Sequence, residues 1–423
     1  MPDAGPVIRS MTPRVTEGSA DAGTVAWTRA MQAAFLAPRL EPELLARVGA
    51  TFEGQRLRGA YADPDPSPAA TLRSWDAELT VPGGAVTADA ITGIGVRSTH
   101  RRRGLARRLL AEDLAAAVRA GTPAAVLTST QGSLYERFGF GLATRTRAIT
   151  VDTRTARFRD PVARGSIELV DRPDAALALA TSVHGRSRRR HPGALGRTPG
   201  QWDALLTGAG PHSGLEPDRH RQFAVWRDDE GTPAGYVVHR VEEHWYATGA
   251  ATLGVVDLQA TTPGAYAELW RHLCSQDLVG TVTWAQASVD EPLPWLVDDH
   301  RAVRVDGERA MVWLRVLDVS AVLVARRYPV EDAIVLDVAD DAGFTTGRWR
   351  LDTHDRLAPA VEPTPDSPDV TLPATSLGSV VLGGVDPRVL ARAGRLEEGS
   401  PGAAGRLARL LAAPSVPWNG TPF

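Results

Sequence analysis

An arginine-rich turn between a predicted strand and a predicted helix is the first place in this sequence where chemistry can be located. The turn is Arg101–Ala106 (RRRGLA); strand-like apolar residues precede it from Ile91, and leucines at helical spacing follow it. A glycine at a helix start lets the backbone approach a ligand closely, and the first-turn N–H groups have no partner inside the helix. Such an end binds anions, and the arginines add positive charge. We therefore predict a phosphate or pyrophosphate site here.

Two common phosphate-binding motifs do not fit this turn. A P-loop ends in Gly-Lys-Ser or Gly-Lys-Thr, and the chain contains no lysine. The dinucleotide fingerprint GxGxxG is also absent here. What remains, Arg101-x-x-Gly104-x-Ala106 directly after a strand, resembles the acetyl-CoA pyrophosphate loop of GCN5-related N-acetyltransferases. Taken alone, the turn is equally well explained by solvated arginines that open an ordinary helix.

A second motif follows at residues 129–140 (STQGSLYERFGF), after a short apolar strand at 123–127. A short helix carrying Tyr135 leads through Gly139-Phe140 into another strand, which is similar to the second half of an acetyltransferase core. The two motifs in this order predict an acetyltransferase domain over residues 1–152.

Acetyl transfer from a thioester to an amine requires three groups, the first of which takes the proton that the attacking amine must lose. The carbonyl oxygen needs a hydrogen-bond donor, and the backbone N–H of Val96, on the strand before the turn, is the natural candidate. The departing thiolate needs an acid, and the phenol of Tyr135, with an ordinary pKa of about 10, suits that role. The alternative is that Tyr135 only packs beside Phe138 and Phe140; its position on the helix favours the acid.

Composition limits the other functions. A chain of 423 residues is too long for one core, and 43% hydrophobic with 23% charged residues is typical of a globular protein in water. A net charge of −3 gives no reason to expect nucleic acid or an anionic membrane as a partner. Without lysine, the chain has no lysine side chain to acetylate on itself.

The single cysteine, Cys274, excludes an intramolecular disulfide and a multi-cysteine metal site, and we expect a buried side chain there and no metal. The first residues lack an apolar stretch of signal-peptide length, and no segment reaches membrane-spanning length. We therefore expect a cytoplasmic protein.

Two further domains are expected. Residues 153–305 show a second mixed α/β pattern without an RxxGxA turn, which suggests a copy of the acetyltransferase fold that does not bind CoA. Its basic run Arg186–Arg190 lacks interleaved aromatic residues, so we interpret it as a solvated loop and not as a phosphate or nucleic-acid site. Residues 306–423 form the third domain, and the tail 416–423 (VPWNGTPF) is apolar enough that we expect it to pack.

The whole chain resembles the Eis ("enhanced intracellular survival") family of actinobacterial N-acetyltransferases. The matching segments are 98–105 (STHRRRGL), 132–141 (GSLYERFGFG), 290–294 (DEPLP) and the terminal phenylalanine. The resemblance implies an α+β chain with tandem GCN5-related acetyltransferase folds, the second degenerate, followed by an α/β domain similar to sterol carrier proteins. It also implies a homohexamer.

The resemblance further implies roles for particular residues. The terminal carboxylate of Phe423 would be the general base, for which burial would have to raise its ordinary pKa of about 3.3–3.7. Tyr135 matches the family's proton donor. Acetyl-CoA, the co-substrate, would contact Ile94, Gly95, Val96, Arg102, Arg103, Gly104, Leu105, Ala106, Arg107, Thr130 and Gln131.

Members of the family acetylate several amines of an aminoglycoside, and also lysine side chains. A polycationic aminoglycoside favours carboxylates in its pocket, yet residues 31–37 (MQAAFLA) contain none; Glu41, Glu43 and Asp76 are possible substitutes. Aminoglycoside acetylation is our leading prediction. A peptide-lysine acetyltransferase is the main alternative, and a lipid-binding protein that uses the C-terminal domain is a third.

Overall fold

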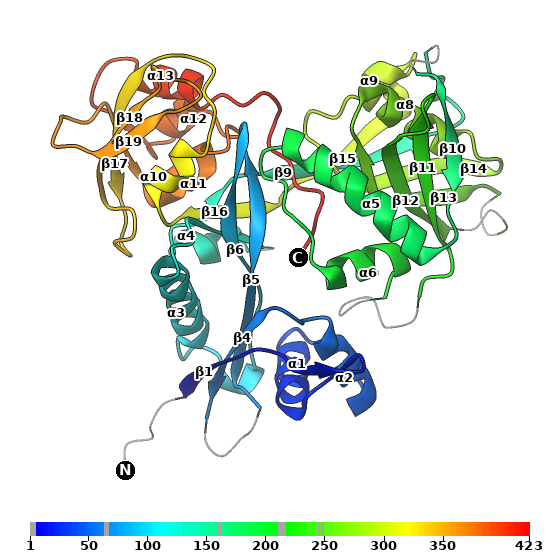
Figure 1. The fold of residues 1–423 in the computed structure, drawn as a ribbon, viewed down its shortest axis with the longest axis horizontal. Coiled ribbons are helices and arrows are strands. Elements are labelled where there is room, and N and C mark those ends of the chain that lie inside the picture. Colours follow the sequence, from blue (N-terminus) through cyan, green and yellow to red (C-terminus); the bar gives the residue numbers. More distant parts are fainter. Residues whose placement is uncertain are drawn as a thin grey trace.

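The computed structural model describes residues 6–62, 67–129, 131–159, 163–209, 217–243, 246 and 249–423, which form three sheets with helices against them (Figure 1). The first sheet has the order β1-β4-β5-β6-β7-β16-β8. Its strands are β1 (Val7–Met11), β4 (Arg56–Tyr61), β5 (Ala70–Val81), β6 (Gly84–Val96), β7 (Ala124–Thr128), β8 (Gly141–Leu142) and β16 (Val312–Val316), and β2 (Val15–Thr16) pairs with β3 (Ser19–Ala20) separately.

Helices cover the two faces of the first sheet. The leucines of α3 (Leu105–Arg119) recur at helical spacing and pack against Leu72, Ile91 and Leu127 on one face. On the other side, α1 (Ala22–Ala34) and α2 (Pro42–Ala50) enclose a small core that includes Trp27. Pro42 begins α2, where the missing N–H has no cost.

The second sheet repeats this pattern, as predicted for a second acetyltransferase fold. Four antiparallel strands are followed by a helix and a parallel strand, in the order β10-β11-β12-β13-β14-β9-β15. The strands are β9 (Arg145–Asp152), β10 (Gly165–Leu169), β11 (Arg221–Asp228), β12 (Pro233–Glu243), β13 (Ala251–Ala260), β14 (Val279–Ala287) and β15 (Val303–Ala310), with helices α5 (Pro173–Ser187), α6 (Pro199–Thr207), α8 (Pro263–Cys274) and α9 (Leu293–Leu296).

The third sheet has the order β19-β18-β17-β20-β21 and belongs to the C-terminal domain. Its strands are β17 (Ala333–Ala339), β18 (Gly347–Asp352), β19 (Ala360–Pro363), β20 (Val370–Pro373) and β21 (Glu397–Glu398), and its helices are α10 (Val319–Val324), α11 (Ala374–Val380), α12 (Pro387–Arg392) and α13 (Ala403–Leu410). In the described ranges no helix has the length and apolar character needed to cross a bilayer, and no three His, Cys, Asp or Glu side chains gather as a metal site would require.

Strand pairing crosses the predicted boundaries at 152 and 305. Strand β9, which ends the first predicted segment, lies in the second sheet between β14 and β15. Strand β16, from the third segment, lies in the first sheet between β7 and β8. The first segment therefore supplies a strand to the second sheet, and the third segment supplies one to the first sheet. Strand β16 closes the edge that β7 would otherwise expose.

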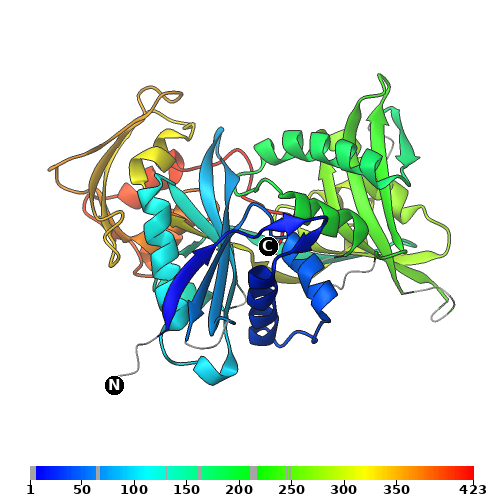
Figure 2. The ribbon, with the colours of Figure 1, turned by 60° about the horizontal axis from the view of Figure 1, so that its bottom comes forward.

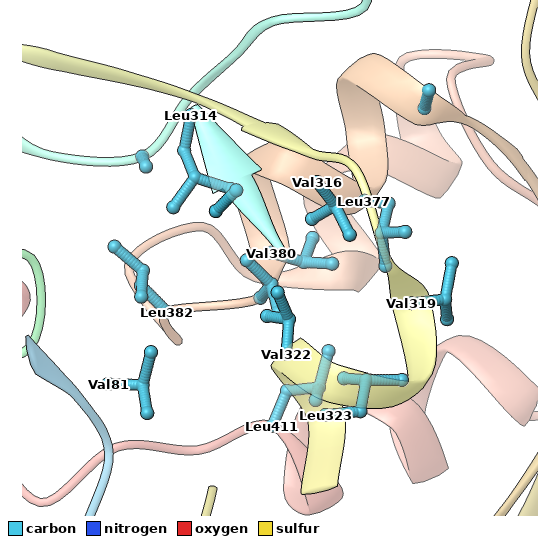
Figure 3. Close-up of a cluster of buried hydrophobic side chains, with 14 of the residues drawn as sticks. Val81, Leu314, Val316, Val319, Val322, Leu323, Leu377, Val380, Leu382 and Leu411 are labelled. Atoms are coloured by element: carbon cyan, nitrogen blue, oxygen red, sulfur yellow. The ribbon is translucent and has the colours of Figure 1, made fainter. Parts of the chain in front are cut away.

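The exchanged strand β16 joins the first sheet to the C-terminal domain through one continuous core. Figure 3 shows Leu314 and Val316 of this strand among side chains from α10 and α11, with Val81 from β5 nearby. The Arg315 side chain is fully buried and pairs with Asp340 across 2.5 Å. Removing part of this core should therefore weaken two domains at once.

We expect the substitution Leu314→Ala to lower the free energy of unfolding by about 3 kcal/mol, since Leu314 is completely buried and its removal leaves a cavity. The thermal unfolding midpoint measures the effect. The control is Val305→Ala on β15, where the side chain is 51% exposed and the midpoint should hardly change. Equal midpoints for the two variants would contradict a shared core.

The prediction that Arg186–Arg190 is a loop is wrong, although Arg186, Arg189 and Arg190 are exposed to solvent as expected. The run spans the end of α5 and a 3₁₀ turn, and it packs against β5. The Arg188 side chain is 11% exposed and pairs with Glu78 at 2.7 Å, while Arg190 donates to the carbonyl of Thr261. These partners are distant in sequence, so the basic run links the first two domains.

Candidate active site

Strands β6 and β7 form a wedge in the middle of the first sheet. They pair in parallel from Ala88–Ile91 against 124–127, and the pairing ends there. Beyond that point β6 carries a bulge opposite β5, because the register moves from Arg73↔Thr92 to Thr71↔Gly95. Gly93, in the bulge, has a φ of +63°. A bulge bends its strand, and here it turns the end of β6 away from β7.

The predicted phosphate-binding turn lies beside this wedge. Gly104 precedes α3 with a φ of +71° and no side chain caps the helix, so the first-turn N–H groups face outward. A cavity of about 210 Å³ opens here. It is lined by Ile94, Val96, His100, Arg101, Arg102, Gly104, Leu105, Ala106, Arg107, Leu110, Leu134, Tyr135, Arg137 and Phe138.

The cavity brings together most of the residues predicted from the sequence. Ile94, Val96, Arg102 and the segment 104–107 line it with Tyr135, whereas Gly95, Arg103 and Gln131 do not, and Thr130 lies outside the described residues. Sequence reasoning assigned no binding role to His100, Arg137 or Phe138. These residues lie within the two quoted motifs, so their place in the motifs could have indicated that they line the cavity.

Substituting Gly104 should weaken acetyl-CoA binding. A left-handed φ costs a non-glycine residue about 1–2 kcal/mol, so we expect Gly104→Ala to raise the KM for acetyl-CoA by roughly 5- to 30-fold. Gly121→Ala is the matched control, because Gly121 has a φ of +74° and, like Gly104, open space around a Cβ, but ends α3 away from the cavity. Equal KM values for the two variants would place the turn outside the binding site.

The N–H of Val96 points into the wedge. Arg97 donates its backbone N–H to the carbonyl of Ala69, the residue before β5, at 2.9 Å, and Val96 stands opposite Ala70. Since neighbouring residues of an antiparallel strand point their N–H groups to opposite sides, that of Val96 faces away from β5. The side it faces is the one from which β7 has separated.

Tyr135 reaches the cavity from α4 (Gly132–Glu136). Its half-buried ring packs edge-on against Phe140, with ring centroids 6.3 Å apart, so the side chain also contributes to packing. Burial raises the pKa of the Tyr135 phenol above its usual value. The group therefore stays protonated at neutral pH, as a general acid must.

The chain ends at the opposite face of the same wedge. Thr128, the last residue of β7, donates its hydroxyl to a terminal oxygen of Phe423 at 2.5 Å, and the Phe423 ring packs edge-on against Trp75, with centroids 5.6 Å apart. Trp75 and Phe423 pack on the face opposite α3. Figures 1 and 2 place the C end beside the strands of the first sheet, on the side of the second domain.

The acidic residues considered for an amine pocket do not gather at Phe423. Asp76 alternates with Trp75 along β5, so it points to the other face, where it pairs with Arg56 at 2.9 Å. Glu41 and Glu43 are exposed at the start of α2. The residue beside Trp75 on the same face is instead a cation, Arg73.

The guanidinium of Arg73 lies 4.5 Å from the Phe52 ring and 5.7 Å from the Trp75 ring, and donates to the amide oxygen of Gln55 at 2.6 Å. In the described part of the chain no carboxylate pairs with it. Burial lowers the pKa of Arg73 to about 10, which still leaves it charged at neutral pH. A cation therefore stands near the end of the chain.

Comparisons with known proteins agree with this architecture. Residues 18–143 and 193–316 each match an acetyltransferase (GNAT) domain, and 319–420 match a sterol carrier protein domain. A protein of Streptomyces griseus described as an uncharacterized N-acetyltransferase is 37% identical over 93% of this chain and 95% of its own length. The N-acetyltransferase Eis of Mycobacterium tuberculosis is 34% identical over 76% of this chain and 77% of its own.

The crystal structure of Eis1 from Mycobacterium abscessus superposes with a TM-score of 0.83 at 29% identity, over 99% of this chain and all of that one. A GCN5-related N-acetyltransferase of Anabaena variabilis shares the fold with a TM-score of 0.80 at 18% identity. The matched domains, their order and the whole-chain relatives show that this chain is an N-acetyltransferase of the Eis family.

Proposed function

We propose that the chain transfers an acetyl group from acetyl-CoA to primary amines, with the Phe423 carboxylate as general base and Tyr135 as general acid. The observation that carries the proposal is the position of the chain terminus. The carboxylate is bound by Thr128 at the open end of β7, while Tyr135 lines the cavity on the other side of the same wedge. An acceptor and a donor entering from opposite faces would meet between these two groups.

Each residue then has one task in the transfer. The Phe423 carboxylate takes the proton that the amine loses as its nitrogen attacks the carbonyl carbon. The N–H of Val96 donates to the carbonyl oxygen as negative charge develops on it. The Tyr135 phenol gives its proton to the sulfur as the carbon–sulfur bond breaks. The turn at 101–107 holds the pyrophosphate by its arginines and the first-turn N–H groups of α3.

Acetyl-CoA fits these residues, because the cavity joins a cationic helix start to an apolar wall. Arg102 and Arg107 supply charge for phosphates, and Ile94, Leu134 and Phe138 supply an apolar surface for the arm that ends in the thioester. When bound, acetyl-CoA supplies the activated acetyl group.

For the acceptor we propose aminoglycosides, several amines of which would be acetylated in turn, as the family resemblance implies. Arg73 favours a second candidate, the lysine side chain of a peptide, because a guanidinium near the amine site repels a polycation more than a single ammonium. We further propose that the chain works as a homohexamer, again on the resemblance.

Steady-state transfer from acetyl-CoA to a panel of aminoglycosides and of lysine peptides tests the acceptor. Release of CoA thiol measures the rate, and mass spectrometry counts acetyl groups per acceptor. Turnover with two or more acetyl groups on one aminoglycoside supports the first candidate. Turnover of peptides alone would retain the acetyltransferase chemistry and reject the aminoglycoside. The variant Arg73→Gln should raise kcat/KM for aminoglycosides more than for peptides if this cation opposes them.

A further inference from the structure

Residues 415–421, close to the end of the chain, are bound by the second domain. The hydroxyl of Ser415 donates to the carbonyl of Arg190 at 2.9 Å, and the N–H of Val416 donates to Asp290 at 3.4 Å. Trp418 donates its backbone N–H to Pro192 and its indole N–H to Gln286, both at 2.8 Å. The basic run and the DEPLP segment, to which the catalytic mechanism assigns no task, thus both contact the tail.

Near the end of the tail, both polar atoms of the Asn419 side chain have hydrogen-bond partners. The amide oxygen of Asn419, which is fully buried, accepts from the N–H groups of Leu195 and Thr421, both at 3.3 Å. Its amide nitrogen donates to the carbonyl of Thr421 at 2.7 Å. The segment Asn419–Thr421 therefore has one fixed shape, two residues before the terminal carboxylate.

A buried ion pair of the second domain, Arg197–Asp257, contacts this segment through a hydrogen bond. Arg197 donates through Nε to the hydroxyl of Thr421 at 2.8 Å, and through Nη1 to Asp257 at 2.7 Å. Both side chains of the pair are 2% exposed. Tyr236 donates to the same Asp257 carboxylate at 2.6 Å. A buried charge pair is stable only when further hydrogen bonds satisfy it, and the tail supplies one of them.

The tail lies where β13 and β14 part, which is the counterpart of the catalytic wedge. These strands pair in parallel from Ala251↔Val279 to Val255↔Trp284, and beyond that point the tail contacts both. Trp418 binds the carbonyl of Gln286 on β14, and a Cβ on Gly420 would lie 3.5 Å from Gln259 on β13. The tail occupies the end of β13–β14 that corresponds to the acetyl site of the first domain.

The wedge between β13 and β14 lacks the free helix N–H groups that would bind an anion. Pro263, at the start of α8, has no N–H, and Thr262 accepts from the N–H of Ala265 at 3.1 Å, so the first turn of this helix is already capped. The first domain has Gly104 and no cap at the equivalent place. The wedge offers instead the Trp284 ring, 6.1 Å from that of Trp418, and the Arg197–Asp257 pair.

We propose that the second domain is a receptor for the C-terminal peptide of its own chain, and that Arg197 is a positioning residue for the Phe423 carboxylate. Its ligand is an extended peptide with tryptophan and threonine three residues apart, ending in a free carboxylate. Binding of the tail to the second domain does not depend on the role of Phe423. Only the effect of that binding on the rate rests on the proposed role of Phe423.

The test uses full-length variants and two measurements. In Thr421→Val, which removes only the acceptor of Arg197, and in Arg197→Met, we expect amides of residues 416–423 to exchange hydrogen about tenfold faster. We expect kcat to fall about tenfold, with the KM for acetyl-CoA unchanged, because a displaced base misses the amine. Arg227→Met, which removes an exposed ion pair with Glu168 in the same domain, is the control and should change neither.

Rescue in trans identifies the ligand. A full-length W418A/T421V chain, its own tail released, should regain kcat saturably when the peptide VPWNGTPF is added. An amidated peptide should compete without restoring the rate. Unchanged exchange in Thr421→Val, or no saturable peptide effect, would overturn the receptor. Faster exchange with an unchanged kcat, or rescue by the amidated peptide, would keep the receptor and reject the carboxylate as base.

Discussion

A variant that lacks Phe423 should still bind acetyl-CoA and should lose roughly 10²- to 10⁴-fold in kcat, the usual range for removing a general base. Deletion leaves a carboxylate on Pro422, but one residue, about 3.5 Å, further back along the chain. That carboxylate cannot keep the hydrogen bond with Thr128 while Asn419 and Thr421 remain docked. The loss should appear in kcat, because the cavity that we propose for acetyl-CoA lies on the other face of the sheet.

Two variants separate the carboxylate from the ring that bears it. Phe423→Leu keeps the terminal carboxylate and loses only the edge-on contact with Trp75, so most of kcat should remain. A chain extended by one glycine keeps the ring and moves the carboxylate, and should behave like the deletion. Full activity in the deletion variant would reject the terminal carboxylate as base. A Leu variant as slow as the deletion would assign the effect to packing.

The local motifs of the active site could be predicted from the sequence, because they depend on residues close together in the chain. Gly104 and the leucine spacing of α3 predict a helix start at this turn, and the structure has an uncapped helix there. Tyr135 follows within the next helix, so its approach to the same cavity needs only the standard order of elements. The Eis resemblance added the one distant partner, Phe423.

Features that depend on distant partners could not be predicted in this way. The alternation of Val312–Val316 predicts a strand and does not say that it pairs with β7 and β8, far back in the chain. Likewise, the charges of the run 186–190 predict exposure to solvent. Nothing nearby in the sequence indicates that Arg188 pairs with Glu78 or that Arg190 donates to the carbonyl of Thr261.

The tail's receptor was missed for the same reason. Arg197 lies in no motif, and its partners Tyr236, Asp257 and Thr421 are scattered over the sequence. The available signal was the apolar tail itself, with its two prolines, its tryptophan and its terminal phenylalanine. It indicated that the tail packs without indicating where.

The substitution Tyr135→Phe should reduce kcat by about 10²-fold or more while leaving the KM for acetyl-CoA nearly unchanged. Phenylalanine keeps the edge-on contact with Phe140 and the apolar wall of the cavity, so only the proton donor is lost. Tyr61→Phe is the matched control. Tyr61 is also half-buried with a raised pKa, but its hydroxyl contacts Met11, on the edge of the sheet.

The pH dependence gives a second, independent measurement. A general acid must be protonated, and burial raises the pKa of Tyr135 above its ordinary 10. The wild type should therefore hold its kcat up to about pH 10 and lose it above that value, as the phenol ionises. The Phe variant, with no phenol to ionise, should lack this alkaline decrease. If Tyr135→Phe keeps both kcat and the alkaline limb, the tyrosine is a packing residue and the thiolate leaves without its proton.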